Sequence, residues 1–371
     1  MTTAQFRTAV SLRLAMWLRS AAFGLLASMT AVAAAEETAA GPESAKDRVA
    51  LVVVVGVAGE PEFAPRFAEW ADRWRTAGEA AGAAVTLLRP EDATDEMATR
   101  RQLAEAIERL GVQRPSSLWV VLIGHGTFDG KTARFNAAGP DIAAAELSQW
   151  LRPVECPVAV INCTAMSSPF VNALSAPNRV VVTATRTGQQ ENVTRLGDFL
   201  SETVRTGRGD FDKDGSVSLL EMAVDAAART AASYEDETRV ASENALIDDN
   251  ADGRGTRLDW FDGVRLRADK SDRADRIDNT LSRELVLAPG PEAATLSESQ
   301  RGRRRELERR LERLRGARPE RPDADYFEQL EAILVPLARL YAESDAESDA
   351  SDKDGDAPQP DAPAAKSTDA D

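Results

Sequence analysis

The sequence has little of the side chains that most protein chemistry uses. Histidine occurs once among 371 residues, as His125, and cysteine occurs twice. His125 is therefore the one side chain whose unperturbed pKa lies near neutrality. Positive charge is also in deficit, because 61 acidic residues against 45 lysines and arginines give a net charge of −16. Without a dominant basic face, nucleic-acid binding is not expected.

The two cysteines, Cys156 and Cys163, are not expected to pair. They flank the apolar run 157–162, and a strand there would hold them about 23 Å apart, at about 3.3 Å per residue. A disulfide needs Cα atoms within about 7 Å of each other. Cys163 is then a free thiol, and we interpret Cys156 as a packed or incidental one.

No apolar run is long enough to span a membrane. The run nearest to that length lies close to the N-terminus. There, three arginines precede a stretch of mainly Ala, Leu and Phe, and small residues follow it. This order is typical of a secretory signal peptide over residues 1–35, followed by a polar linker over 36–46. The stretch is shorter than the roughly 20 residues of a membrane span. We therefore expect an exported protein, periplasmic or extracellular, with no membrane span after cleavage; an uncleaved anchor or a disordered leader is the alternative.

Apolar runs alternate with amphipathic segments through the middle of the chain. Runs rich in valine, leucine and isoleucine predict buried strands, and apolar residues at three- and four-residue spacing predict helices. The alternation predicts an α/β fold with a doubly wound, mostly parallel sheet, within a domain that spans 47–290. The expected strands are 49–55, 85–88, 118–123, 157–162 and 179–183, and the main expected helices are 62–82 and 96–110.

His125 and Cys163 each follow one of these strands. Open α/β sheets place their sites beyond the carboxyl ends of strands. If the two strands are neighbours, the imidazole and the thiol face each other, as a cysteine nucleophile and its base require. Gly126 could also approach an oxyanion closely, because glycine has no Cβ. The alternative is a turn-capping histidine and an ordinary buried cysteine.

These residues resemble the caspase/legumain clan of cysteine peptidases, which carry one apolar block ending in His-Gly and a second ending in Cys. The resemblance covers about 48–206 and implies His125 as base, Cys163 as nucleophile, and the N–H groups of Gly126 and Cys163 as the oxyanion hole. It also implies that Thr185 and Arg186 line the substrate pocket. Arg186 would favour an acidic substrate residue there, unless it is a solvated surface charge.

The sequence departs from the clan at three places near Cys163. Asn162 replaces the usual small residue, Ile161 replaces an acid that often stands two residues before the nucleophile, and a glycine that often follows soon after is absent. These differences leave cleavage specificity open and allow an inactive homologue.

An acidic segment matches the twelve-residue EF-hand calcium loop at each position. Gly215 makes the sharp turn at position six, and helices are expected on both sides. The predicted Ca²⁺ ligands are Asp210, Asp212, Asp214, Ser216 through its carbonyl, Ser218 and Glu221. The alternative is a solvated acidic turn.

A second segment, 248–259, starts in the same way and then departs. Gly255 replaces the apolar residue through which EF-hands usually pair, and Asp259, with its shorter reach, stands at position twelve. This segment is either a weak metal site or a structural turn.

The C-terminal part predicts a charged helical hairpin over 291–342. Its helices, 298–316 and 324–342, are candidates for self-association. The tail 343–371 holds ten acids and two lysines, and we expect it to be disordered.

Together these patterns predict an exported caspase/legumain-like cysteine endopeptidase that acts on a peptide or protein and carries a calcium loop. The alternative is a catalytically inactive caspase-like calcium-binding protein that acts as a binding or scaffold module.

Overall fold

The computed structural model describes residues 48–267, 278–288, 298–316 and 323–354. The predicted signal peptide, the linker and the end of the predicted tail lie outside these ranges. None of the described helices is long and apolar enough to cross a membrane.

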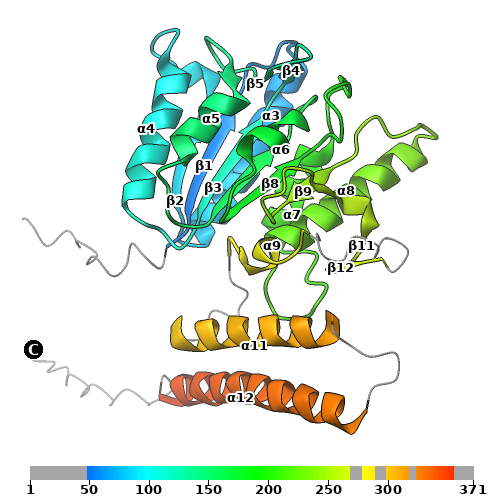
Figure 1. The fold of residues 1–371 in the computed structure, drawn as a ribbon. Coiled ribbons are helices and arrows are strands. Elements are labelled where there is room, and N and C mark those ends of the chain that lie inside the picture. Colours follow the sequence, from blue (N-terminus) through cyan, green and yellow to red (C-terminus); the bar gives the residue numbers. More distant parts are fainter. Residues whose placement is uncertain (1–47, 268–277, 289–297, 317–322, 355–371) are drawn as a thin grey trace, which may run out of the picture. The chain divides into compact units, whose positions relative to one another are not determined.

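A seven-stranded sheet forms the centre of the chain, in the order β10-β9-β8-β7-β3-β1-β2 (Figure 1). All five predicted strands are present and pair in parallel, which confirms the mostly parallel α/β class. They are β1 (Ala50–Val55), β2 (Ala84–Leu88), β3 (Leu118–Ile123), β7 (Val158–Asn162) and β8 (Arg179–Thr183).

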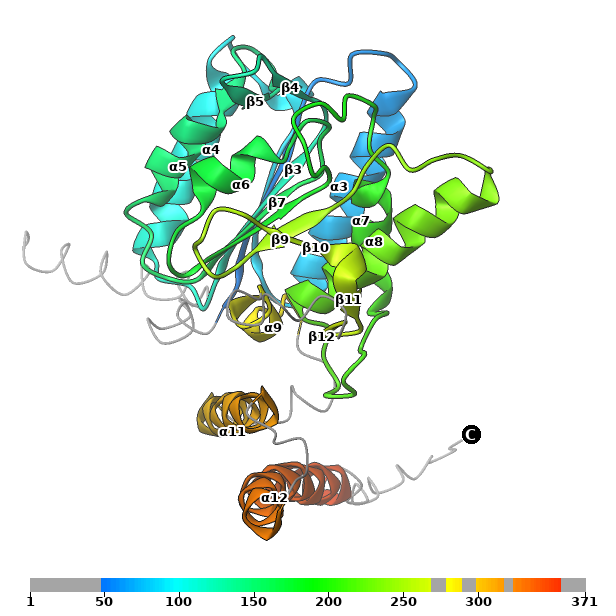
Figure 2. The same cartoon turned by 45° about the vertical axis from the view of Figure 1, so that its right-hand side comes forward.

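Helices cover both faces of this sheet, as the view in Figure 2 shows. One face packs on α3 (Phe63–Ala80), α7 (Leu196–Thr206) and α8 (Leu219–Asp236). The other packs on α4 (Ala98–Val112), α5 (Ala144–Leu151) and α6 (Pro169–Leu174). Successive strand residues point to opposite faces, so each central strand contributes to both cores.

Two features of the sheet were not predicted from the sequence. β9 (Leu246–Asp248) and β10 (Thr256–Arg257) extend it antiparallel beyond β8. The polar stretch after β3 forms a small antiparallel sheet of β4 (Gly126–Phe128), β5 (Ala133–Phe135) and β6 (Ile142–Ala143). These strands are only two or three residues long, too short for a clear period-two pattern.

The remaining elements are short. They are the 3₁₀ turns η1 (Pro90–Asp92) and η2 (Leu258–Trp260), the hairpin of β11 (Phe261–Asp262) and β12 (Arg265–Leu266), and α9 (Leu281–Glu284).

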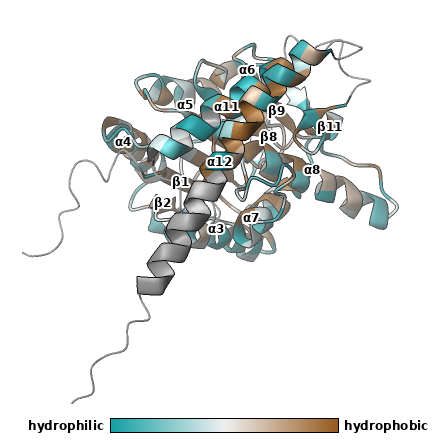
Figure 3. Cartoon of the chain, turned by 90° about the horizontal axis from the view of Figure 1, so that it is seen from below, coloured by the Kyte–Doolittle hydropathy of each residue, from teal (hydrophilic) through white to brown (hydrophobic). Residues whose placement is uncertain are grey.

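The predicted hairpin consists of α11 (Glu298–Gly316) and α12 (Ala324–Asp354). Leu307, Leu311 and Ile333 form its small buried core. Figure 3 shows α11 mainly hydrophilic, whereas α12 carries hydrophobic stretches. α12 continues to Asp354 and so enters the tail that we predicted to be disordered from 343. No proline or glycine lies between 343 and 354, so no helix-breaking residue ends α12 before Gly355, even though Ser and Asp outnumber Ala and Glu there.

Candidate functional site

His125 and Cys163 follow strands that lie side by side. β3 pairs with β7, and the last pair in the register joins Leu122 to Asn162. The expectation that these two strands are neighbours is therefore confirmed. Both residues continue the alternation of their strands onto the face that packs on α3 and α7.

The ring of His125 is held by a carbonyl and two aromatic rings. Its Nε2 lies 2.8 Å from the Ala58 carbonyl oxygen, in the loop after β1, and donates to it. Phe63 and Phe67 of α3 each meet the imidazole edge to face, with ring centroids 5.3 Å apart. A proton on Nε2 leaves Nδ1 as the nitrogen that can accept a proton, so Nδ1 is the nitrogen through which His125 could act as a base.

Gly126 allows the segments after β3 and β7 to touch. A Cβ at this position would fall 2.5 Å from both the Thr164 hydroxyl oxygen and the Ala165 carbonyl oxygen. No side chain can be accommodated there without displacing the segment that follows Cys163. The segments that follow β3 and β7 are therefore in direct contact, as the sequence predicted, and this contact requires glycine at position 126.

Cys163, in contrast, is completely enclosed. Its relative exposure is 0%, and it belongs to the core beneath α3 and α7. A Cβ placed on Gly197 would lie 3.0 Å from the Cys163 Cβ and 2.8 Å from the Trp70 ring, so α3, α7 and the cysteine converge tightly. Burial, with a smaller effect from the Glu243 carboxylate, raises the pKa of the thiol to about 12. A neutral, enclosed thiol is not a competent nucleophile in this arrangement.

The backbone of Cys163 is also committed. Its N–H donates to the Leu122 carbonyl at 2.9 Å, which extends the β3–β7 ladder, and its carbonyl accepts the hydroxyl of Thr194. The N–H that we predicted as an oxyanion donor is therefore already occupied by the sheet. Of the two predicted donors, only Gly126 is left for that role.

The predicted substrate-pocket residues have different environments. Thr185 has a relative exposure of 0% and exchanges hydrogen bonds with Ser167, and its hydroxyl accepts the Ser168 N–H at 3.1 Å. Arg186 is exposed, and its backbone N–H donates to the Gln190 side chain at 2.7 Å. Thr185 thus ties β8 to the segment after β7 and does not present an open surface to a substrate.

The residues that depart from the clan pattern have structural roles here. The side-chain oxygen Oδ1 of Asn162 accepts the N–H and the hydroxyl of Thr164, at 3.0 and 2.7 Å. Met166 has φ +50°, a left-handed conformation that glycine adopts without strain. The segment after Cys163, which lacks glycine, thus turns through a non-glycine residue.

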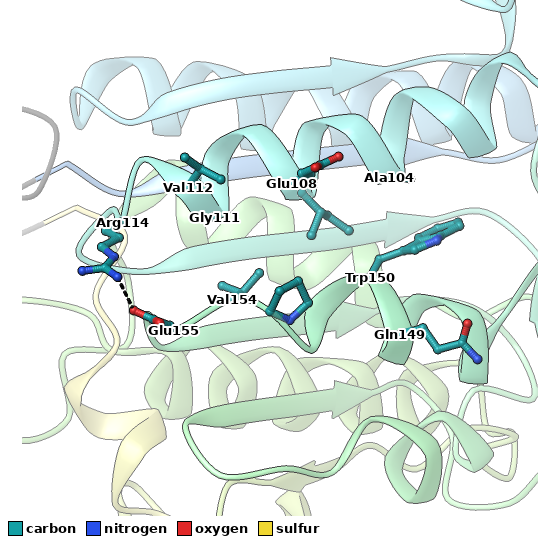
Figure 4. A pocket seen from close by; sticks show the side chains of 11 residues that line it. Ala104, Glu108, Gly111, Val112, Arg114, Gln149, Trp150, Val154 and Glu155 are labelled. Atoms are coloured by element: carbon teal, nitrogen blue, oxygen red, sulfur yellow. Dashed lines mark ion pairs between the residues drawn. The ribbon is translucent and has the colours of Figure 1, made fainter.

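A surface hollow of about 470 Å³ lies away from these residues (Figure 4). It is lined by α4, the end of α5 and the segment that leads into β7, where Arg114 pairs with Glu155 at 2.8 Å. These segments lie at the amino ends of β3 and β7. The hollow is therefore at the opposite edge of the sheet from His125 and Cys163, and it contains neither Thr185 nor Arg186.

The acidic loop between α7 and α8 brings three carboxylates together. One oxygen from each of Asp210, Asp212 and Asp214 lies within 4.8 Å of the others, and among the described residues no other set of three His, Cys, Asp or Glu side chains does so. The Asp210 carboxylate accepts the N–H groups of Asp214 and Gly215, at 3.1 and 3.2 Å. Gly215 has φ +81°, the turn for which glycine is required.

Glu221, at position twelve, closes this loop. One carboxylate oxygen accepts the N–H groups of Phe211 and Asp212, and the other accepts the N–H and the hydroxyl of Ser218. Ser218 in turn caps α8 by accepting the Glu221 N–H. Burial raises the pKa of Glu221, and the Asp212 carboxylate raises it further. Glu221 and the three aspartates thus place carboxylate oxygens around one loop, the type of ligand that Ca²⁺ prefers.

Two arginines from later in the chain meet this loop. Arg304 of α11 donates to the second Asp214 oxygen at 2.9 Å, and Arg283 of α9 lies 3.3 Å from Asp212. Sequence reasoning missed both, because nothing local to either arginine indicates its partner. They supply positive charge to the loop.

Glu243 is a further buried carboxylate that the sequence did not single out. It accepts the N–H groups of Arg195 and Leu196, at 2.7 and 3.2 Å, and the Tyr234 hydroxyl at 3.0 Å. It thereby holds the N-terminus of α7, the helix that covers Cys163. Burial raises its pKa.

Comparisons with known proteins place few limits on this site. No protein-family model matches the chain, and no curated protein matches it significantly. Among solved structures, caspase-1 of Spodoptera frugiperda is 12% identical with a TM-score of 0.39, over 55% of this chain and 89% of that one. The Drosophila initiator caspase Dronc is 12% identical with a TM-score of 0.37, over 56% and 81%. A Geobacter sulfurreducens protein is 13% identical with a TM-score of 0.35, over 49% and 89%. Likenesses this remote assign no activity.

Proposed function

We propose that this chain is a calcium-binding α/β protein whose loop 210–221 holds Ca²⁺ and whose His125 and Cys163 do not form a working peptidase pair. The observation that carries the proposal is the loop itself, which gathers three aspartate carboxylates within 4.8 Å and closes on Glu221. Hard oxygen ligands in a flexible twelve-residue loop are what Ca²⁺ requires.

The electrostatics of the loop support a cation. Burial raises the pKa of Asp214, and the neighbouring Asp212 and Asp210 carboxylates raise it as well, although Arg304 opposes them. Like charges held this close repel one another. A divalent ion between them would relieve that repulsion, which Arg304 and Arg283 relieve in part from the rim.

Calcium titration calorimetry on the intact protein tests this proposal. Glu221→Gln removes the charge of the bidentate ligand, so we expect calcium affinity at this loop to fall by at least about tenfold. Glu105→Gln is the matched control, since Glu105 lies on the exposed face of α4. Calcium at about 100 times Kd should stabilise the fold by about 2.7 kcal/mol and raise Tm by roughly 5–10 °C. Equal affinities in both variants, or an unchanged melting temperature, would refute the proposal.

A second candidate function is the cysteine endopeptidase that the sequence resemblance implies, acting on a peptide or protein. The adjacency of β3 and β7, and the Nε2 bond that leaves Nδ1 of His125 available, favour it. It would require a rearrangement that exposes Cys163. Labelling by a thiol-reactive peptide probe that is lost in Cys163→Ala and kept in Cys156→Ala would establish it.

We also propose export to the periplasm or outside the cell. The arginine-rich, apolar and small-residue order of 1–35 supports this. N-terminal sequencing of protein recovered from the native host checks it: cleavage near Ala35 is expected, and an intact Met1 in the cell interior would contradict it.

A further inference from the structure

The second acidic segment contains a buried carboxylate without a partner. Asp248, at the end of β9, has a relative exposure of 1%, and neither of its carboxylate oxygens has a hydrogen-bond partner. Burial has the largest effect on its pKa and raises it; the nearby Ser175 hydroxyl lowers it, and the carboxylates of Asp252 and Asp249 raise it. A buried carboxylate without a hydrogen-bond partner costs folding free energy, and a bound cation would offset that cost.

The backbone of this segment repeats that of the loop 210–221. At position four, Lys213 and Ala251 have φ +62° and +64°, and at position six, Gly215 and Gly253 have φ +81° and +70°. At position seven, the N–H donates to the aspartate of position five in both, at 2.8 Å. The two loops therefore share one conformation up to this point.

Asp259, which the sequence register places at position twelve, does not close the second loop. Its side chain is 52% exposed and pairs with Arg257. The two loops thus differ at the ligand that matters most for a bidentate calcium contact.

Asp278 takes the place that Asp259 leaves open. One of its oxygens accepts the N–H groups of Asp249 and Asn250, at 2.8 and 3.2 Å, and the other accepts the Thr256 hydroxyl at 2.6 Å. These donors are at positions two, three and nine of the loop. Glu221 accepts from the same three positions in the first loop, and Asp278 is 1% exposed.

We propose that the segment from Asp248 to Thr256 is a second Ca²⁺ site, completed by Asp278 from 22 residues beyond Thr256. The ligands are the side chains of Asp248, Asn250, Asp252 and Asp278, with the carbonyl of Arg254. Its carboxylates are not gathered as closely as those of Asp210, Asp212 and Asp214, so binding draws Asp252 inward. The two loops pair with different partners, since β10 pairs with β9 and Ser218 of the first loop pairs with Val286, but α9 contacts both, through Ser282 to Asp249 and Arg283 to Asp212.

Native mass spectrometry and calorimetry with CaCl₂ alone test the inference on the full chain. The protein is expected to bind about two Ca²⁺ ions. Asp278→Asn should leave one, Glu221→Gln should leave one, and the double variant none. Asp259→Asn is the matched control, and it should keep both ions.

The outcomes separate the two loops. One ion that is lost in Glu221→Gln and kept in Asp278→Asn would overturn the second site and leave the first intact. Loss of an ion in Asp259→Asn, but not in Asp278→Asn, would overturn the role of Asp278. If Asp278→Asn fails to fold in the absence of calcium, as far-ultraviolet circular dichroism would show, Asp248→Asn replaces it, and two ions retained by that variant would likewise overturn the site.

Discussion

The carboxyl end of the sheet and the acidic loop were both predicted as functional sites. In the structure the reactive group is buried at the first and the charged groups remain accessible to one another at the second. At the sheet end, Cys163 is covered by α3 and α7, and its N–H completes the ladder to Leu122. At the loop, three carboxylates remain together, and distant arginines approach them. Like charges held this close repel one another, so a cation would lower the energy at the loop, whereas the enclosed thiol has no comparable need of a ligand.

The largest expected effect is the protection of the Cys163 thiol. Because Cys163 is fully buried and Cys156 is half-buried, native-state alkylation of Cys163 should be at least about 10³-fold slower, which corresponds to an opening free energy of about 4 kcal/mol. Rates measured with iodoacetamide, on Cys156→Ser and Cys163→Ser, assign each thiol. Equal rates would show that the sheet end opens readily and would strengthen the peptidase candidate.

A smaller effect is expected from adding one methyl group at Gly126. Gly126→Ala places a Cβ against the Ala165 carbonyl and the Thr164 hydroxyl, so we expect a loss of about 2–3 kcal/mol in the free energy of unfolding. Gly302→Ala is the control, because a Cβ there meets nothing within 4 Å in helix α11. That change should instead stabilise by about 0.5–1 kcal/mol. If urea denaturation gave similar values for both variants, the segments after β3 and β7 would not be in contact.

The sequence predicted those parts of the molecule that depend on local patterns. The five parallel strands follow from apolar runs, and the clustering of Asp210, Asp212 and Asp214 follows from side chains at fixed spacing; calcium binding by that cluster stays a prediction. The burial of Cys163 had a partial signal, since Ala159, Ile161 and Cys163 alternate onto one face. Its cover could not be predicted, because Trp70 and Gly197 come from distant parts of the chain.

Contacts between residues distant in the sequence also explain why the second acidic loop was predicted only in part. Its first positions are visible in the sequence, but the carboxylate that completes its hydrogen bonding is Asp278, which no fixed spacing indicates. Position twelve of the sequence register, Asp259, instead forms a surface ion pair. Local spacing therefore located the loop and missed the residue that closes it.

The smallest expected effect concerns the arginine that meets the first loop. Arg304 is 10% exposed and pairs with Asp214, so in the proposed calcium site it would compete with Ca²⁺ for a ligand oxygen. Arg304→Gln removes this competing charge and should raise calcium affinity about three- to fivefold, or about 1 kcal/mol. Arg303→Gln is the matched control, since Arg303 is exposed and pairs within its own helix with Glu306. Calorimetry measures the calcium affinity of both variants. Equal affinities would mean that breaking the Arg304–Asp214 ion pair costs no free energy, and that α11 has no influence on calcium binding at the loop.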